Sequence, residues 1–159
     1  MKFLQKKDIQ KGETLIEALA ALALVAIVIS AITTLITTSL SNATYNENQT
    51  LATKYAQQGI ESVRQIRNFN YAAFRNYNGL YCLGKGQANL GTVQTACSTP
   101  NTDNFIRSVQ IEHSPGCATN VARVTVNVAF TDGKCEGNTY CHVQTHTSCL
   151  STVNPNGTL

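Results

Sequence analysis

The sequence predicts an α+β protein in which one long N-terminal helix, membrane-spanning in its N-terminal half, packs against a small head with an antiparallel sheet. The first observation is the segment Leu15–Ile36, where one glutamate, one serine and two threonines are the only polar residues. It offers about twenty apolar positions, the length that a helix needs to cross a bilayer. The second observation is three strand candidates in the C-terminal half, of which the middle one most clearly alternates apolar and polar residues, as strands do.

A helix at the centre of a soluble core is also apolar on every side, and this is the alternative interpretation of the segment. The rest of the sequence is more polar and offers little apolar surface to surround such a helix. We therefore expect a single membrane span.

The charge of the chain is concentrated before Gly12. Lys2, Lys6, Lys7 and Lys11 against one aspartate give +3, which equals the formal net charge of the whole chain, +3. By the positive-inside rule this basic flank holds the N-terminus in the cytoplasm, so the remainder is exported. The near-neutral remainder does not indicate a uniformly basic surface for nucleic acid.

The order of these N-terminal features differs from that of a secretory signal peptide, in which the cleavage site follows the apolar segment. Here the small residue, Gly12, lies between the lysines and the apolar segment. A cut after Gly12 would remove residues 1–12 as a basic leader peptide and keep the membrane helix.

Residues 11–17, Lys-Gly-Glu-Thr-Leu-Ile-Glu, followed by a long apolar helix, resemble the processing motif of type IV pilins and of the pseudopilins of type II secretion. The resemblance implies a pilin-like fold and cleavage by prepilin peptidase between Gly12 and Glu13. It also implies N-methylation of Glu13. It further implies that Glu17 acts in assembly, where its carboxylate neutralises the terminal amine of a neighbouring subunit.

The sequence departs from the family pattern at two positions. Glu13 stands where the family usually has phenylalanine, and Thr34 stands at the place of an interior proline, so no proline kink is expected. An alternative interpretation of Glu17 needs no partner, because the positive end of a helix dipole also favours a carboxylate in the first turns.

The long helix is expected from Thr14 to Asn68, with a membrane or filament-core half at residues 13–41 and an amphipathic half at residues 42–68. At 1.5 Å per residue such a helix would be about 80 Å long. In the second half, apolar and small residues fall on one stripe at helical spacing, which predicts a face covered by the sheet. The stripe comprises Ala52, Tyr55, Ala56, Gly59, Val63 and Ile66.

Residues 69–159 are expected to form the exported head. A long connection is predicted from Gly79 to Asn104, followed by strands at Phe105–Glu112, Val121–Phe130 and Tyr140–Leu150. Turn residues separate these strands, which predicts an antiparallel meander packed on the helix.

All six cysteines lie in the exported part, which indicates a disulfide framework. If the last two strands pair, Cys135 and Cys141 lie near one turn, and Cys149 returns toward the other turn, which carries Cys117. This arrangement suggests the disulfides Cys117–Cys149 and Cys135–Cys141, and by remainder Cys82–Cys97. Six cysteines allow fifteen pairings, so the others stay open at this stage.

The sequence contains no motif that indicates catalysis. His142 and His146 would share one face of a strand near several cysteines, a combination that can bind zinc. No Cys-x-x-Cys pair is present and export favours oxidised cysteines, so we expect no metal site, no cofactor and solvent-facing histidines. Neither the nucleophile motif Gly-x-Ser-x-Gly nor His-Glu-x-x-His occurs, which argues against an enzyme.

Together these features predict a structural subunit, a major or minor pilin, of a type IV pilus-like filament. Its partners would be other pilins in a homo- or hetero-polymer, prepilin peptidase and the membrane assembly machinery. The precursor would lie in the inner membrane as a single-pass protein, and the mature subunit in an extracellular filament on the cell surface. A pseudopilin of type II secretion and a single-span anchored binding module that does not polymerise remain open alternatives.

Overall fold

A computed structural model describes residues 13–113, 116–135, 137 and 139–153 of the chain. The leader, residues 1–12 with Gly12, lies outside the described residues. The chain divides into two compact units, residues 1–43 and 44–159. Helix α1 (Glu13–Phe69) contributes its first part to one unit and its second part to the other.

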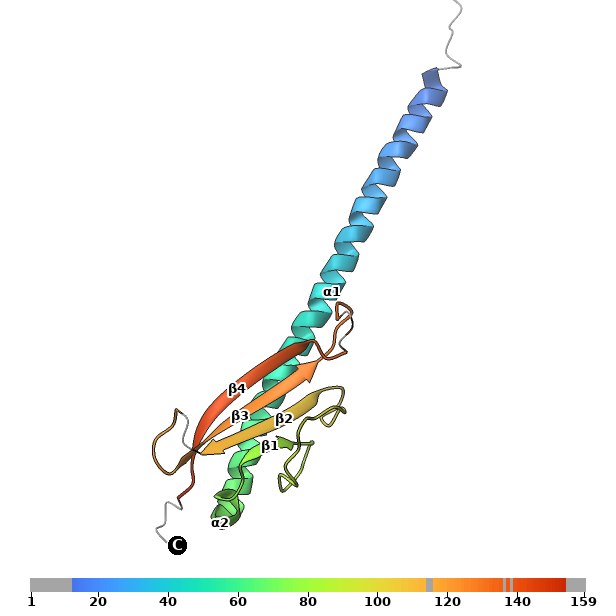
Figure 1. Ribbon diagram of the computed structural model, residues 1–159. Coiled ribbons are helices and arrows are strands. Elements are labelled where there is room, and N and C mark those ends of the chain that lie inside the picture. Colours follow the sequence, from blue (N-terminus) through green and yellow to red (C-terminus); the bar gives the residue numbers. More distant parts are fainter. Residues whose placement is uncertain (1–12, 114–115, 136, 138, 154–159) are drawn as a thin grey trace, which may run out of the picture. The chain divides into compact units, whose positions relative to one another are not determined.

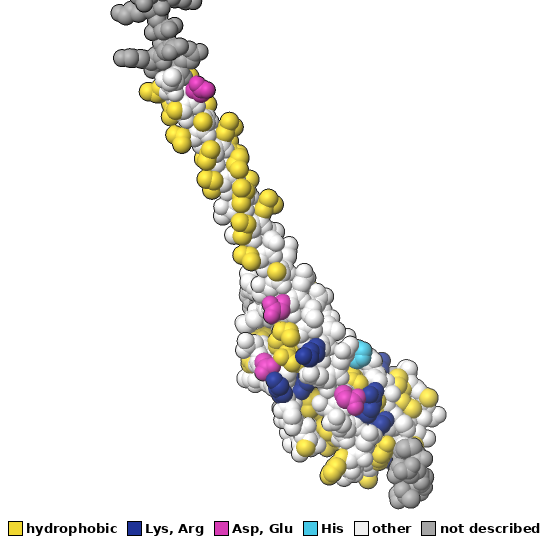
Figure 2. Space-filling model, turned by 180° about the vertical axis from the view of Figure 1, so that it is seen from behind, with side chains coloured by type: hydrophobic (Ala, Val, Ile, Leu, Met, Phe, Trp, Pro, Cys, Tyr) yellow, Lys and Arg dark blue, Asp and Glu magenta, His cyan; other side chains and the backbone are white. Residues whose placement is uncertain are grey.

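In the first unit, α1 exposes large apolar side chains on every side, as Figure 2 shows for one face. Thirteen leucine, isoleucine and valine side chains between residues 15 and 40 are 50–70% exposed. A helix that is apolar all round is stable in lipid or against other helices rather than in water. This is the one helix among the described residues that is long and apolar enough to cross a membrane.

The second unit is built on a four-stranded antiparallel sheet (Figure 1). The strands follow one another in space in the order β1-β2-β3-β4, so the sheet is a simple meander. Their bounds are β1 (Gly79–Cys82), β2 (Ile106–His113), β3 (Val121–Phe130) and β4 (His142–Ser151).

The expected meander is confirmed, and the three expected strands agree with β2, β3 and β4 to within two residues. The expectation of one long connection from Gly79 to Asn104 is wrong at its start, where β1 pairs with β2 over four residues. Leu80 of β1 also forms a bridge to Gln94. A strand of four residues is too short to show a period of two, so only its tertiary partner identifies it.

A short helix, α2 (Tyr71–Phe74), ends the helical part of the chain. Asn70 caps it, because its side-chain oxygen accepts a hydrogen bond from the backbone N–H of Ala73 at 2.9 Å. The turn places Phe74 in the core, where it is fully buried.

The core lies between the second part of α1 and one face of the sheet. The expected stripe on α1 is buried, except that Tyr55 is half-buried. Alternate residues of the strands cover it, because every second side chain of a strand points to the same face. The strand residues of this core include Val109, Ile111, Val124, Val126 and Val128, each 0% exposed.

Gly59 brings α1 close to the sheet. A Cβ atom at this position would lie 2.8 Å from Cγ1 of Val126 and 3.2 Å from Cδ of Arg107, closer than carbon atoms normally pack. The absence of a side chain therefore sets how near the helix approaches β3.

Three disulfides cross-link the head: Cys82–Cys97 and Cys117–Cys149 each join a loop to a strand, and Cys135–Cys141 closes the turn between β3 and β4. We name them the β1 disulfide, the β2–β3 disulfide and the β3–β4 disulfide, after the strand or turn that each one ties down. They join the two pairs that the strand arrangement suggested and the third pair that followed by remainder, and no described cysteine is free.

Candidate functional site

The first candidate site is the N-terminal end of α1. Glu17 lies four residues after Glu13, so the two positions occupy one face of the helix one turn apart. The first backbone N–H groups of a helix have no intrahelical acceptor and carry partial positive charge, which favours a carboxylate nearby. Glu17 is exposed, and its carboxylate makes no hydrogen bond or ion pair to another described residue. Its carboxylate is thus open to a cation from outside the described chain.

Hydroxyl residues within the apolar part of α1 satisfy their own hydrogen bonds. Thr33 donates to the carbonyl oxygen of Ile29 at 2.9 Å, and Thr34 donates to that of Ser30 at 3.0 Å. Ser30, Thr37 and Thr38 make equivalent bonds one turn back. These bonds remove the cost of placing free hydroxyl groups in an apolar environment, so the helix continues without interruption.

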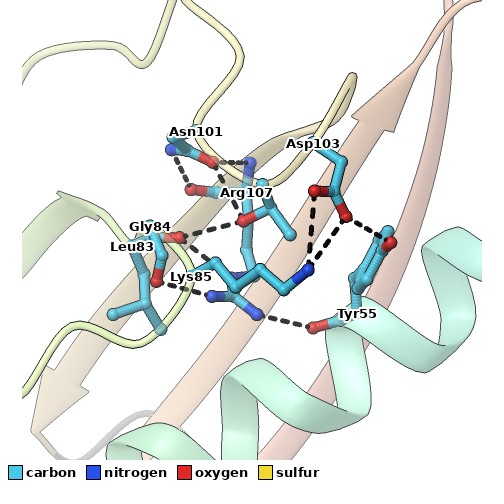
Figure 3. Close-up of polar contacts among 8 residues, drawn as sticks. Tyr55, Leu83, Gly84, Lys85, Asn101, Asp103 and Arg107 are labelled. Carbon is cyan, nitrogen blue, oxygen red and sulfur yellow. Dashed lines mark hydrogen bonds and ion pairs between the residues drawn. The ribbon is translucent and has the colours of Figure 1, made fainter.

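The second notable cluster surrounds Arg107, an arginine that is 2% exposed in the head (Figure 3). Its guanidinium group donates to three backbone carbonyl oxygens: Nη2 to Gly84 at 2.7 Å, Nε to Leu83 at 2.9 Å and Nη1 to Tyr55 at 3.3 Å. Burial lowers the pKa of Arg107, because the charged form loses hydration. One side chain therefore links α1 to the connection that follows β1.

Asn101 completes this link from the other side. Its side-chain oxygen accepts from the backbone N–H of Arg107 at 2.8 Å, and its amide donates to the backbone oxygen of Arg107, also at 2.8 Å. These two hydrogen bonds pair the backbone N–H and C=O of Arg107 as a neighbouring strand would, and they hold the connection beside β2. Arg107 and Asn101 together replace the regular pairing that the connection lacks.

Asp103 marks the exposed rim of the same cluster. Tyr55 donates its hydroxyl proton to Asp103 at 2.6 Å, and Lys85 lies 3.4 Å from the same carboxylate. The tyrosine hydrogen bond, followed by that of Lys85, lowers the pKa of Asp103, while the same bond raises the pKa of Tyr55. The contact fastens the loop before β2 to α1 at the edge of the core.

The turn between β3 and β4 gathers Asp132, Cys135, Cys141 and His142, whose potential ligand atoms lie within 4.8 Å of one another. The two sulfur atoms are joined in the β3–β4 disulfide, so neither supplies the thiolate that zinc prefers. Nε2 of His142 lies 3.2 Å from Oδ1 of Asp132, and the backbone N–H of Lys134 chiefly lowers the pKa of Asp132. The disulfide and the contact between Asp132 and His142 together hold the turn between β3 and β4.

The expectation of solvent-facing histidines is wrong for His142. Its ring stacks on Phe130 with centroids 5.2 Å apart and meets the edge of Tyr45 at 5.0 Å. His146 is exposed. The two residues share a face of β4, but only His142 lies where α1 and the end of β3 cover that face.

A comparison with protein families finds a known motif in the N-terminal segment. Residues 7–33 match the prokaryotic N-terminal methylation motif. This is the prepilin-type motif of type IV pilins and pseudopilins, and it contains Gly12, Glu13 and Glu17. No curated protein and no solved structure matches the chain.

The prepilin-type motif supports a type IV pilin-like or pseudopilin protein, and therefore a structural protein rather than an enzyme. Together with the apolar part of α1, it fits a membrane-anchored precursor that becomes part of a surface filament. The matched region ends at residue 33, so the comparison gives no information about the head.

Sequence reasoning missed Arg107 and Asn101, which hold the head together. One signal was present, because Arg107 occupies an inward position in the alternation of β2, where an apolar residue is expected. A charged residue at an inward position indicates buried hydrogen-bond acceptors, but the sequence does not show which acceptors these are.

Proposed function

We propose that this chain is a pilin, a structural subunit that polymerises through α1 into a type IV pilus-like filament. The observation that carries the proposal is the exposed carboxylate of Glu17 inside a predominantly apolar helical segment that begins at a prepilin-type processing motif. A catalytic or ligand-binding role would not require these three features together.

Processing would create the partner for Glu17. Prepilin peptidase hydrolyses the peptide bond between Gly12 and Glu13, which leaves a carboxyl group on Gly12 and a new amine on Glu13. Methylation of that amine keeps its positive charge. The precursor enters the membrane with the lysines of the leader on the cytoplasmic side.

The charge of Glu17 then selects a neighbouring subunit. A carboxylate in the bilayer costs about 2.5–3.5 kcal/mol at the centre of a helix and less near the interface, and such groups usually pair with a cation. The amine of Glu13 in an adjacent subunit supplies this cation. Docking neutralises both charges in one step, so entry into the filament is favoured over free diffusion in lipid.

The exposed apolar side chains of α1 provide the remaining stabilisation. In lipid they contact acyl chains, and in the filament they pack against the same segment of neighbouring subunits. The disulfide-bonded head stays outside this helical core. Other pilins, prepilin peptidase and the assembly machinery are the partners that this model requires.

The test replaces Glu17 with valine in the native cells and measures the protein in sheared surface filaments. We expect Glu17→Val to be cleaved and retained in the membrane but absent from filaments. The matched control is Glu47→Val, which removes an exposed glutamate from the same helix within the second unit and should still enter filaments.

The intact, non-reduced mass of the sheared protein reports processing at the same time. We expect the mass of residues 13–159 with one added methyl group and six hydrogens missing. Normal filament incorporation of Glu17→Val would refute the role of Glu17. An uncleaved chain that stays in the membrane would favour the anchored binding module, and a processed chain confined to the cell envelope would favour a pseudopilin.

A further inference from the structure

The last strand of the sheet, β4, has an open edge. The sheet ends at β4, which pairs with β3 on one side only (Figure 1). Among the described residues, no other segment pairs with its outer edge. Along a strand, the N–H and C=O groups of successive residues point alternately to one side and to the other. The outer side of β4 therefore presents unpaired donors and acceptors along its ten residues.

β4 lacks the features that usually protect an edge strand, which are lysines, prolines, bulges or short length. Its sequence, HVQTHTSCLS, has no lysine, arginine, aspartate, glutamate or proline. Its ten pairs with β3 follow without interruption from Val121↔Ser151 to Phe130↔His142, so no bulge bends it away. The opposite edge strand, β1, is only four residues long and is partly covered by Gln94.

Two disulfides hold β4 at its ends. Cys141 directly precedes the strand and is bonded to Cys135, and Cys149 within the strand is bonded to Cys117. Fixing both ends reduces the conformational freedom that an incoming strand would otherwise have to remove. The edge is therefore extended and pre-organised for pairing.

The composition of β4 favours a second β4 as the occupant of this edge. A strand without lysine, arginine, aspartate or glutamate places none of these charges opposite its own copy, and it offers none of them by which to select an acidic or basic peptide. Two copies of β4 that pair antiparallel are related by a two-fold axis perpendicular to the sheet, which keeps the outward side chains of both copies on the outer face. Residues opposite each other must then point to the same face, so the axis passes through one residue of the strand and not between two residues.

Centring the pair on His146 places Thr145 opposite Thr147 of the second copy, and Thr147 opposite Thr145 of the second copy. These threonines already form cross-strand contacts on the outer face, where Thr147 Oγ1 lies 3.2 Å from Oγ1 of Thr125 and Thr145 donates to Asn127 at 2.8 Å. Threonine pairs of this kind stabilise sheets. The same row of hydroxyl groups would continue across both sheets.

We propose that β4 is a homotypic docking edge, which pairs antiparallel with β4 of a second copy around His146. Because the two-fold axis reverses the chain direction, the paired heads belong to different filaments of the kind proposed above. A single edge pair is weak, and repetition along two filaments makes it strong by avidity. The edge would therefore act in lateral bundling of filaments.

The test uses opposite charges at the centre of the pair. His146 is exposed, so both His146→Lys and His146→Glu are compatible with the fold. In either variant alone, like charges lie opposite each other, and we expect association to weaken about fivefold. An equimolar mixture places lysine opposite glutamate and should restore association to at least the wild-type strength.

The association constant is measured by sedimentation of the oxidised full-length chain in detergent micelles, which cover the apolar part of α1. Hydrogen exchange, measured across a range of protein concentrations, should show that alternate amides of β4 become protected as association increases. The matched controls are Gln110→Lys and Gln110→Glu, which carry the same charges on the central strand β2 and should associate as the wild type does.

Three results would overturn the proposal: β4 amides that exchange equally at every concentration, single variants that associate as the wild type does, or a mixture that fails to recover. The measurement does not depend on filament assembly, and Glu17→Val should associate through β4 as strongly as the wild type. A failure of this test is therefore distinguishable from a failure of the proposed pilin function.

Discussion

Replacing Arg107 with methionine tests whether one buried side chain joins the connection after β1 to helix α1. Methionine keeps an unbranched apolar stem of similar length but removes the charge and all donors. The carbonyl oxygens of Leu83, Gly84 and Tyr55 then lose partners that lie 2.9, 2.7 and 3.3 Å away. Because Arg107 is only 2% exposed, water does not readily replace these hydrogen bonds.

The magnitude follows from the two shorter bonds. A hydrogen bond from a charged donor contributes about 1.5–3 kcal/mol, which gives about 3–6 kcal/mol for the bonds to Leu83 and Gly84. Removing the guanidinium group also recovers part of the cost of burying a charge that pairs with no carboxylate among the described residues. We expect the free energy of unfolding of the head to fall by about 2–4 kcal/mol.

The assay is urea unfolding of the oxidised full-length chain in detergent. The chain has no tryptophan and six tyrosines, so near-ultraviolet circular dichroism of the tyrosines reports the head without the signal of the apolar helix. The matched control is Arg75→Met, an exposed arginine for which we expect a change below about 0.5 kcal/mol. A loss below about 1 kcal/mol for Arg107→Met would refute the reasoning.

Three further predictions concern the head. Gly59→Ala should destabilise it by about 1 kcal/mol in the same urea assay, because overpacking at β3 outweighs the gain of about 1 kcal/mol in helix propensity; a more stable variant would contradict this. Replacing both cysteines of one disulfide with serine should lower the free energy of unfolding by about 3.7 kcal/mol for the β2–β3 disulfide, about 3.1 kcal/mol for the β1 disulfide and about 2.4 kcal/mol for the β3–β4 disulfide. The loss decreases in this order because the closed loops become shorter. The reverse order would contradict the loop-entropy argument. Since the pKa of Asp103 is lowered in the folded protein, the stabilisation from its contact with Tyr55 is complete above about pH 4 and is lost as the pH falls through the folded pKa. Asp103→Asn should therefore flatten this part of the acid unfolding curve. An unchanged curve would exclude the contact as the cause of the acid dependence.

Sequence periodicity predicted the elements whose side chains repeat with a clear spacing. The strand Val121–Phe130 was predicted with its observed bounds, because five inward positions alternate without interruption. Helix α1 was predicted to within one residue at each end, since both its apolar part and its stripe keep helical spacing. Strand β1 was missed because four residues carry no period, and its hydrogen bonds to β2 alone define it.

The sequence by itself determined the prepilin-type N-terminus, the membrane-length helix and the cysteine-rich composition of the head. These properties are local, because a processing motif, an apolar length and a charge asymmetry are each complete within a short segment of the chain. The histidines show the limit of local reasoning: His142 and His146 share one strand face, but only His142 is half-buried, by its contacts with Tyr45 and Phe130.

Only the tertiary structure decided how the head is held and which of its surfaces are open. The acceptors of Arg107 come from residues 24, 23 and 52 positions earlier in the chain, a distance over which no local pattern acts. The same holds for β4, whose uncharged sequence became an open edge because the meander ends there and no described segment covers it. Contacts between distant segments create these features, so they become visible only when the chain has folded.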